Sequence, residues 1–274
     1  MKKLLVVLLV LAVGIFAIGC CGGGEEAAEQ ETTKLVVGAT PVPHAEILEF
    51  IKPMLAEKGI ELEVKEFTDY VQPNQALFDK QLDANYFQHL PYLEQFNIDN
   101  NMDLTYTVSV HFEPMGVFSD KITSLDQLEN GAKIGVPSDP TNEARALLLL
   151  QDNGILKLKD GVELKATKID IVENPKNIEI VEMEAAQLAT SLPDMAAAVI
   201  NGNYALDAGH AISDAIVAED KDSVAAKTFG NILAIRAGDE VRPEIQALSE
   251  VLNSDEVRTF IEENYAESGF VPTF

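Results

Sequence analysis

Residues 83–96 combine the side-chain types that bind a small organic molecule. The segment, DANYFQHLPYLEQF, places amide and imidazole groups among aromatic rings. Apolar rings can enclose a compact ligand, while Asn85, Gln88 and His89 can supply directional hydrogen bonds, which is the usual composition of a ligand pocket. The same rings could instead belong to a hydrophobic core, with His89 as a core or surface imidazole. The segment therefore indicates either a ligand pocket or a core element.

A second polar group accompanies the predicted start of a helix. In VPSDPTNEARALLLL a strand ends at Pro137, residues 138–142 cap a helix, and Arg145 follows about one turn later. The free N–H groups of a helix N-terminus and the bidentate fork of an arginine both suit a carboxylate. In the alternative interpretation, Asp139 and Thr141 only cap the helix, and Arg145 pairs with a nearby acidic residue.

Sequence signatures of enzymes are absent. The chain has no G-x-S-x-G, H-E-x-x-H, Walker A or G-x-G-x-x-G motif, so we expect a binding protein without a cofactor. The four histidines, His44, His89, His111 and His210, are too far apart in sequence to form a local metal pair. They could converge in space with an acidic residue, so a cation-binding receptor is an alternative of a different class.

The N-terminal segment up to Thr33 reads as an export signal followed by a tether. Two lysines, an apolar run over residues 4–18 and then small residues are typical of a secretory signal, here residues 1–19. The sequence AIGC, which ends at Cys20, resembles a lipoprotein signal-peptidase site, at which the cysteine becomes the lipidated N-terminus. An uncleaved hydrophobic anchor is the alternative. Residues 20–33 are acidic and of low complexity, which predicts a flexible tether at an extracytoplasmic membrane surface.

The charge balance is strongly acidic. Lys and Arg number 20 against 45 Asp and Glu, a formal net charge of -25; without Lys2 and Lys3 of the signal it is 18 against 45, or -27. Such a field repels phosphate backbones and anionic head groups, so we expect no nucleic-acid binding and no bilayer contact beyond the anchor. No cysteine follows Cys21, so the exported part must be held together by its core rather than by a disulfide.

The elements that would position these groups alternate between strand and helix. Residues 34–40 read as a strand, residues 44–59 carry apolar side chains at helical spacing, and residues 61–67 alternate with period two. This order predicts a βαβ unit and a parallel sheet. The pattern starts again after Pro137, which predicts a second α/β lobe. Residues 243–265 read as one long amphipathic helix that ends the chain.

Several separate motifs together resemble one known family. FTDYVQPNQAL, LDANYFQHLPYLEQ, VPSDPTNEARALLLLQ and AVINGNYA occur in the order found in the NlpA-type methionine-binding lipoproteins of ABC importers, from about Val36 to the C-terminal GFVP. The resemblance implies a type II periplasmic-binding-protein fold, in which two α/β lobes are joined by two crossing strands and a ligand binds in the cleft. We expect the first lobe to comprise residues 34–112 and 234–274 and the second lobe to comprise residues 113–233. The crossings are expected near residues 110–118 and 231–235.

The resemblance also implies a set of ligand contacts. Tyr70, Phe87 and Tyr92 would surround a thioether side chain, and His89 would join the polar contacts. Arg145 would hold the α-carboxylate. The side chains that would help to fix the backbone groups of the amino acid are those of Asn142, Asn201 and Asn231.

The implied function is that of a receptor rather than an enzyme. It would be a lipid-anchored extracytoplasmic protein that delivers methionine, with L-methionine expected first, to a membrane permease and its cytoplasmic ATPase. A receptor for D-methionine, for a methionyl dipeptide or for another small amino acid is the alternative within the same class.

Overall fold

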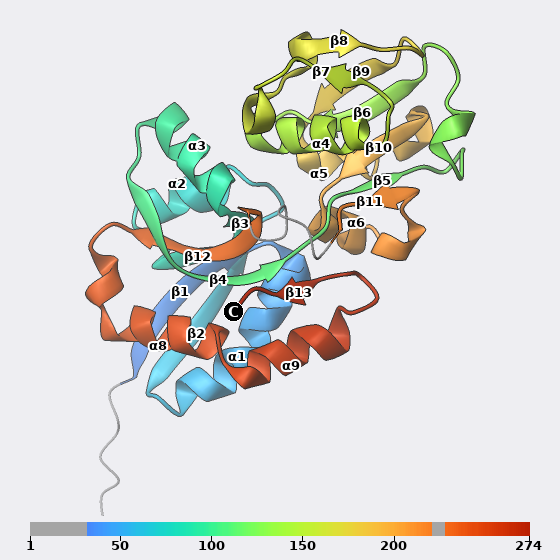
Figure 1. Cartoon of the computed structure of the whole chain (residues 1–274). Coiled ribbons are helices and arrows are strands. Elements are labelled where there is room, and N and C mark those ends of the chain that lie inside the picture. Colours follow the sequence, from blue (N-terminus) through green and yellow to red (C-terminus); the bar gives the residue numbers. More distant parts are fainter. Residues whose placement is uncertain (1–31, 221–227) are drawn as a thin grey trace, which may run out of the picture. The chain divides into compact units, whose positions relative to one another are not determined.

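The computed structural model of the protein describes residues 32–220 and 228–274. The predicted signal, Cys20 and the tether up to residue 31 lie outside these residues. Two mixed sheets, each with its own helices, and one separate two-stranded sheet form the described part of the chain (Figure 1). We call the larger sheet with its helices the first lobe and the smaller sheet with its helices the second lobe.

The sheet of the first lobe has six strands. The strand β1 pairs in parallel with β2 and β3, and it is fully buried at Leu35, Val37 and Ala39. The period-two pattern predicted for residues 61–67 is confirmed in β2, where Leu62 is buried and Glu61 is exposed. Across the sheet the strands are β13 (Val271–Pro272), β4 (Leu104–Phe112), β12 (Gly230–Arg236), β3 (Ala84–His89), β1 (Thr33–Ala39) and β2 (Ile60–Glu66).

Helices cover both faces of this sheet. On one side α1 (Glu46–Ala56) packs against β2, α8 (Pro243–Leu252) and α9 (Asp255–Asn264), and on the other side lie α2 (Gln72–Phe78) and α3 (Leu90–Asn100) (Figure 1). The helical spacing predicted for α1 is confirmed by the burial of its apolar face. That face consists of Ile47, Leu48, Ile51 and Leu55.

The second lobe has a five-stranded sheet. The strand β6 pairs in parallel with β9 and β10, while β5 is antiparallel to β10 and β11. The helix α4 (Pro140–Asp152) packs on β6, and α5 (Ala185–Leu188) contacts β6 and β10. Across the sheet the strands are β11 (Val217–Ala218), β5 (Gly116–Phe118), β10 (Ala197–Ile200), β6 (Lys133–Pro137) and β9 (Glu179–Met183), and β7 (Lys157–Leu158) pairs separately with β8 (Ile171–Glu173).

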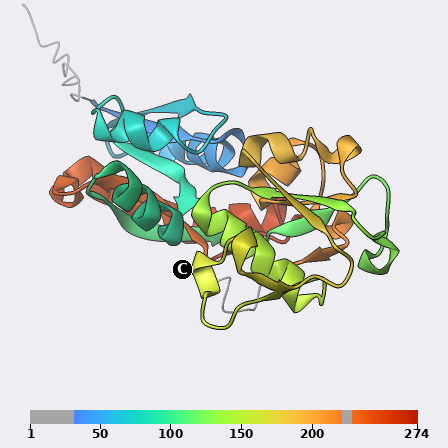
Figure 2. The ribbon, with the colours of Figure 1, turned by 90° about the horizontal axis from the view of Figure 1, so that it is seen from above.

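The chain passes between the two sheets twice. The first passage, residues 113–115, links β4 to β5 and lies within the crossing expected from the sequence. We expected the second passage at residues 231–235. These residues belong to β12, which lies wholly in the sheet of the first lobe, so the second passage precedes Gly230. The exact limits of the lobes stay a proposal. The lobes also touch through α3 and α4, the teal and lime helices that lie side by side in Figure 2.

The prediction of one long C-terminal helix is wrong. The chain forms two helices, α8 and α9, separated at Asn253 and Ser254. The hydroxyl of Ser254 accepts a hydrogen bond from the N–H of Val257, so Ser254 is the N-cap of α9. A serine cap starts a new helix at a position where apolar spacing alone indicates continuation.

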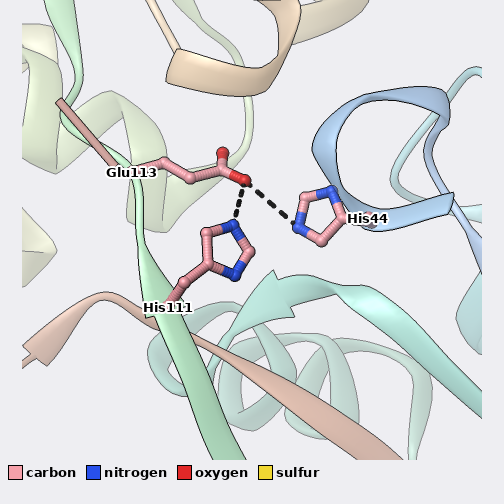
Figure 3. Close-up of side chains that lie close together, drawn as sticks. All are labelled: His44, His111 and Glu113. Atoms are coloured by element: carbon pink, nitrogen blue, oxygen red, sulfur yellow. Dashed lines mark hydrogen bonds and ion pairs between the residues drawn. The ribbon is translucent and has the colours of Figure 1, made fainter. Parts of the chain in front are cut away.

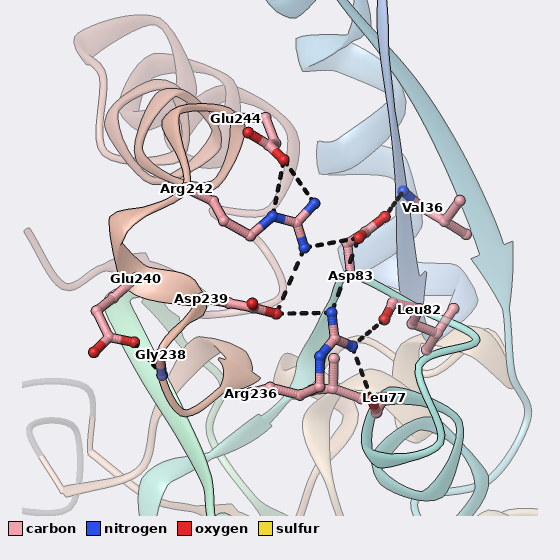
Figure 4. A network of polar contacts seen from close by, with 10 residues as sticks. All are labelled: Val36, Leu77, Leu82, Asp83, Arg236, Gly238, Asp239, Glu240, Arg242 and Glu244. Carbon is pink, nitrogen blue, oxygen red and sulfur yellow. Dashed lines mark hydrogen bonds and ion pairs between the residues drawn. The ribbon is translucent and has the colours of Figure 1, made fainter.

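A network of charged side chains joins distant segments of the first lobe (Figure 4). Asp83, just before β3, binds Nη1 of Arg242 at 2.9 Å and accepts the N–H of Val36 at 2.9 Å. Arg236, at the end of β12, binds Asp239 at 2.7 Å. These side chains are 17–27% exposed, so each pair contributes little free energy, about 1 kcal/mol or less. The network therefore fixes the register of β1, β3 and β12 more than it stabilises the fold.

Candidate ligand-binding site

Strand directions bring the site residues of the first lobe to one edge of the sheet. The carboxyl ends of β1, β3 and β4 lie at this edge, together with the amino end of the antiparallel β12. Asn231 is accordingly in register with both His89 and His111. Ligands of α/β sheets usually bind beyond the carboxyl ends of parallel strands.

The second lobe presents its site residues in the same way. The parallel strands β6 and β10 end side by side, β6 leading into α4 and β10 into α6 (Gly202–Asp207). Asp139 caps α4 by accepting the N–H of Asn142 at 3.0 Å, as the capping interpretation predicted. Asn142 and Arg145 follow on α4, and Asn201 precedes α6.

One cavity is lined by all eight side chains that the resemblance implied as ligand contacts. About 330 Å³ of space free of protein atoms lies in it, part of which is open to solvent, and little of this space is wide enough for a water molecule. Its walls therefore lie close together, and entry of an amino acid requires them to separate. The lining residues are Tyr70, Phe87, His89, Tyr92, Asn142, Arg145, Asn201 and Asn231, together with Gln88, which residue types alone indicated as a hydrogen-bonding group of a pocket, and with Glu113 and Gly202, which we did not predict as contacts.

Aromatic rings form one wall of the cavity. The ring centroid of Tyr70 lies 5.7 Å from that of Phe87 and 5.8 Å from that of Tyr92, and Phe87 and Tyr92 are 6.1 Å apart. The hydroxyl of Tyr92 donates to the carbonyl of Tyr70 at 2.9 Å, which fixes this arrangement. Such a wall suits an apolar, polarizable side chain, because sulfur and methyl groups contact aromatic rings favourably.

Two hydroxyl groups connect the lobes next to this wall. Tyr70 of the first lobe donates to Oδ1 of Asn203 on α6 at 2.6 Å. Tyr204, also on α6, donates to the carbonyl of Thr68 at 3.2 Å. The described structure is thus held together across the cavity by direct contacts between protein groups.

Amide side chains and His89 form a directional network across the cavity. The amide nitrogen of Asn142 donates to both carboxylate oxygens of Asp139, at 3.0 Å each. Its oxygen Oδ1 lies 3.1 Å from Nε2 of His89 and accepts from Nδ2 of Asn201 at 3.0 Å. The N–H of Tyr92 donates to Nδ1 of His89 at 3.2 Å. The proton of the imidazole therefore belongs on Nε2, and burial, reinforced by the charge of Arg145, lowers the pKa of His89 to about 3.

Arg145 is not a free guanidinium at the cavity wall. Its Nε and Nη2 bind the two carboxylate oxygens of Glu219, at 2.7 and 2.5 Å, and Nη2 also donates to the carbonyl of Glu113 at 2.8 Å. The side chains of the ion pair are 4% and 9% exposed. The guanidinium carbon also lies 4.3 Å from the ring centre of Phe229. The pairing with an acidic residue that we considered as an alternative is therefore present, and Arg145 lines the cavity as well.

Two of the four histidines meet a carboxylate at the base of the first-lobe edge (Figure 3). Nε2 of His111 and Nε2 of His44 lie 2.7 and 3.2 Å from Oε1 of Glu113. All three side chains are buried and close enough together to be candidate metal ligands. Burial lowers the pKa of His44 to about 4 and that of His111 to about 3, so both imidazoles are neutral near pH 7. His89 belongs to the amide network instead, and His210 contacts the ring of Phe118.

A cavity lined from two α/β lobes, apolar at one wall and rich in hydrogen-bonding groups at the other, defines a two-lobed substrate-binding protein. The model of the NlpA lipoprotein family matches residues 35–274. The chain therefore belongs to this family, whose members are substrate-binding proteins of ABC transporters and not enzymes. The expected family and the type II periplasmic-binding-protein fold are both confirmed.

Known proteins of similar sequence and structure share the whole domain. The D-methionine-binding lipoprotein MetQ of Salmonella typhi is 41% identical over 249 residues, 89% of each chain. The methionine-binding lipoprotein MetQ of Bacillus subtilis is 39% identical over 270 residues, 97% of each. A nutrient-binding protein of Burkholderia cenocepacia, solved bound to methionine, has a TM-score of 0.83 and 42% identity and covers 88% of this chain and 100% of its own. A periplasmic substrate-binding protein of an ABC transporter from Coxiella burnetii has a TM-score of 0.81 and 39% identity, with 87% and 100% covered.

Proposed function

We propose that this protein is an extracytoplasmic, lipid-anchored receptor that captures methionine, in the first place L-methionine, and delivers it to an ABC importer. The convergence of the eight implied contacts on one cavity is the observation that carries this proposal. The names of the similar MetQ lipoproteins and the methionine-bound relative support the same ligand class.

The two sides of the cavity suit the two ends of this ligand. The thioether side chain would pack against Tyr70, Phe87 and Tyr92. The α-carboxylate would lie toward Arg145, which it would share with Glu219, and toward the amides of the second lobe. A ligand that touches both lobes stabilises the closed arrangement over the open one by its additional contacts. The closed form would then be what the permease, with its ATPase, recognises.

The melting temperature of the domain from residue 32 onward tests this function. L-methionine should raise it, since a ligand that binds only the folded state adds about 4 kcal/mol of stability at a concentration a thousandfold above its dissociation constant. D-methionine, a methionyl dipeptide and alanine, tested in parallel, identify the preferred stereochemistry and size. No response to any of them would contradict the proposal.

A cation receptor is the second candidate, because His44, His111 and Glu113 lie together. The same melting experiment with zinc decides between the two. A rise with zinc that a chelator reverses, without any response to amino acids, would favour the cation site. Both ring nitrogens of His44 and of His111 already have a polar partner within the protein. A metal ion would have to displace these partners, so the contacts favour the amino-acid receptor.

The proposed anchor predicts a change of cell fraction. No helix among residues 32–220 and 228–274 is long and apolar enough to cross a membrane. Replacing Cys20 with alanine should release the protein to the soluble fraction if the signal is processed at that cysteine, because acyl chains contribute about 0.8 kcal/mol per buried CH₂. Fractionation with immunoblotting measures this. A variant that stays with the membrane would show instead that the hydrophobic N-terminus is retained as the anchor.

A further inference from the structure

We propose that the two histidines and the carboxylate beside the cavity bind a divalent transition-metal cation, and that the bound cation excludes methionine. These side chains are His44, His111 and Glu113, and the amide oxygen of Asn231 completes the cluster. The cation would inhibit the receptor, whereas methionine stays its cargo. The exclusion rests on the proposed function, which assigns Asn231 to the amino acid.

The side chains of the cluster direct ligand atoms of the right kind toward one another (Figure 3). Oε1 of Glu113 lies 2.7 Å from Nε2 of His111 and 3.2 Å from Nε2 of His44. Nε2 of His44 also lies 3.2 Å from Oδ1 of Asn231. A tetrahedral site with bonds of about 2.0 Å has ligand atoms about 3.3 Å apart. Two of the three separations therefore fit already, and the shortest must lengthen by roughly 0.6 Å.

Hydroxyl groups hold the other nitrogen of each ring. Nδ1 of His44 lies 2.8 Å from the hydroxyl of Thr40, and Nδ1 of His111 contacts that of Tyr86. In the described structure the proton of each ring belongs on Nε2, because the partners of Nε2 are acceptors. A shift of this proton to Nδ1 frees Nε2 for a metal ion, and the hydroxyl can then accept where it donated before. Such a partner at the second nitrogen is what orients metal-binding imidazoles.

The ligand atoms select the kind of cation. Imidazole nitrogen suits zinc and similar transition metals, whereas calcium and magnesium prefer oxygen ligands alone. Two imidazoles with one carboxylate and one amide oxygen therefore favour zinc. The formal net charge of -25 raises the concentration of any cation near the protein.

A cation in the cluster would change the cavity. Glu113 and Asn231 line the cavity, whereas His44 and His111 are fully buried. The cation would therefore enter by way of the cavity. Once bound, it would occupy Oδ1 of Asn231 and withdraw that oxygen from the amino acid. Cation and methionine should consequently compete.

Cobalt(II) tests the cluster, because it replaces zinc in such sites and absorbs visible light strongly in tetrahedral coordination. The full chain is purified in detergent without a polyhistidine tag and with Cys20→Ser and Cys21→Ser, so that no thiol competes for the metal. One cobalt ion should bind with a tetrahedral spectrum, and zinc should abolish this spectrum.

Variants assign the cobalt signal to the cluster. Loss of an outer-shell partner typically lowers metal affinity about 10–100-fold, so Tyr86→Phe should have an effect of this size. His111→Gln removes a ligand and should lower the cobalt affinity further. His210→Gln is the matched control and should leave the affinity unchanged, because His210 lies against Phe118 and outside the cluster.

Calorimetric titration of the same protein with methionine tests the exclusion. Zinc at about ten times its dissociation constant leaves about one receptor in eleven free, so the apparent affinity for methionine should fall about elevenfold. A chelator should restore the affinity. In His111→Gln the same zinc concentration should have little effect on methionine binding.

The measurements on the protein with an unchanged cluster decide the proposal, whether or not each variant folds. The metal site is overturned if that protein gives no tetrahedral cobalt spectrum, or if folded His111→Gln keeps the full cobalt affinity. Methionine binding that zinc leaves unchanged would overturn the exclusion. Failure to bind methionine in the presence of chelator would overturn the proposed function, while the cobalt spectrum would still decide the metal site.

Discussion

Replacement of Arg145 with alanine is expected to weaken both the fold and the binding of methionine. The change leaves the carboxylate of Glu219 buried without its partner, and breaking a buried ion pair in this way typically costs about 3–5 kcal/mol. In a domain of this size the melting temperature should fall by roughly 6–20 °C. The affinity for methionine should fall by roughly thirtyfold to several thousandfold if Arg145 also holds the α-carboxylate. Thermal unfolding and calorimetric titration measure the two effects separately.

A double variant distinguishes the two roles of Arg145. In Arg145→Ala combined with Glu219→Gln the unpaired charge is removed, so most of the lost stability should return. The affinity should stay low, because the guanidinium is still missing from the cavity wall. Arg145→Lys should recover only part of the affinity, since an ammonium cannot reproduce the planar two-bond geometry. If the double variant bound methionine as the wild-type protein does, Arg145 would have a structural role only.

The second large effect is expected at the aromatic wall. Phe87 is 3% exposed and packs against both Tyr70 and Tyr92, so Phe87→Ala should cost about 3–5 kcal/mol of stability through the cavity that it creates. It should also reduce the preference for methionine over alanine. The preference depends on the burial of the side chain, at about 0.8 kcal/mol per CH₂, and on contacts of sulfur with aromatic rings, at about 0.3–1.5 kcal/mol. Titration with both amino acids gives the preference directly.

Phe96 provides the matched control for this experiment. It is 7% exposed and packs on Tyr92 with a centroid distance of 5.9 Å, but it does not line the cavity. Phe96→Ala should therefore lose stability and keep the preference for methionine over alanine. If the two variants changed the preference equally, the wall would act only through the general packing of α3 and β3, and the placement of the thioether would be wrong.

The spacing of apolar residues in the sequence correctly predicted strands and helices that have one apolar and one polar face. The period of two in β2 and the apolar face of α1 are both present in the structure. The strand β3, in contrast, is buried at all six positions, so its sequence ANYFQH shows no alternation, and we did not predict it as a strand. The break between α8 and α9 depends on the hydroxyl of Ser254, which apolar spacing does not reveal.

The candidate site was predictable only as far as its motifs are contiguous in sequence. Phe87, His89 and Tyr92 lie in one segment, and Asn142 and Arg145 in another, so residue types indicated both groups, and the family resemblance joined them. Glu113 lies in the connection between β4 and β5, with no polar motif around it. Glu113 can be recognised as a site residue only in the folded protein, where it lines the cavity between the lobes and its carboxylate contacts His44 from a much earlier part of the chain. The pairing of Arg145 with Glu219 likewise joins distant parts of the sequence and has no local signal.

The two hydroxyl contacts between the lobes have a consequence for the importer that we propose. The bonds from Tyr70 to Asn203 and from Tyr204 to Thr68 join protein to protein, so they stabilise the closed form with or without a ligand. Each increment of about 1.4 kcal/mol in this stabilisation raises the ratio of closed to open receptor tenfold before methionine arrives. Tighter contacts would increase the affinity, since less of the binding free energy is needed for closure. They would also increase the number of empty closed receptors that compete with loaded ones for the same permease. Stronger bonds between the lobes would therefore raise the affinity for methionine and, at the same time, the fraction of permease contacts that deliver no ligand.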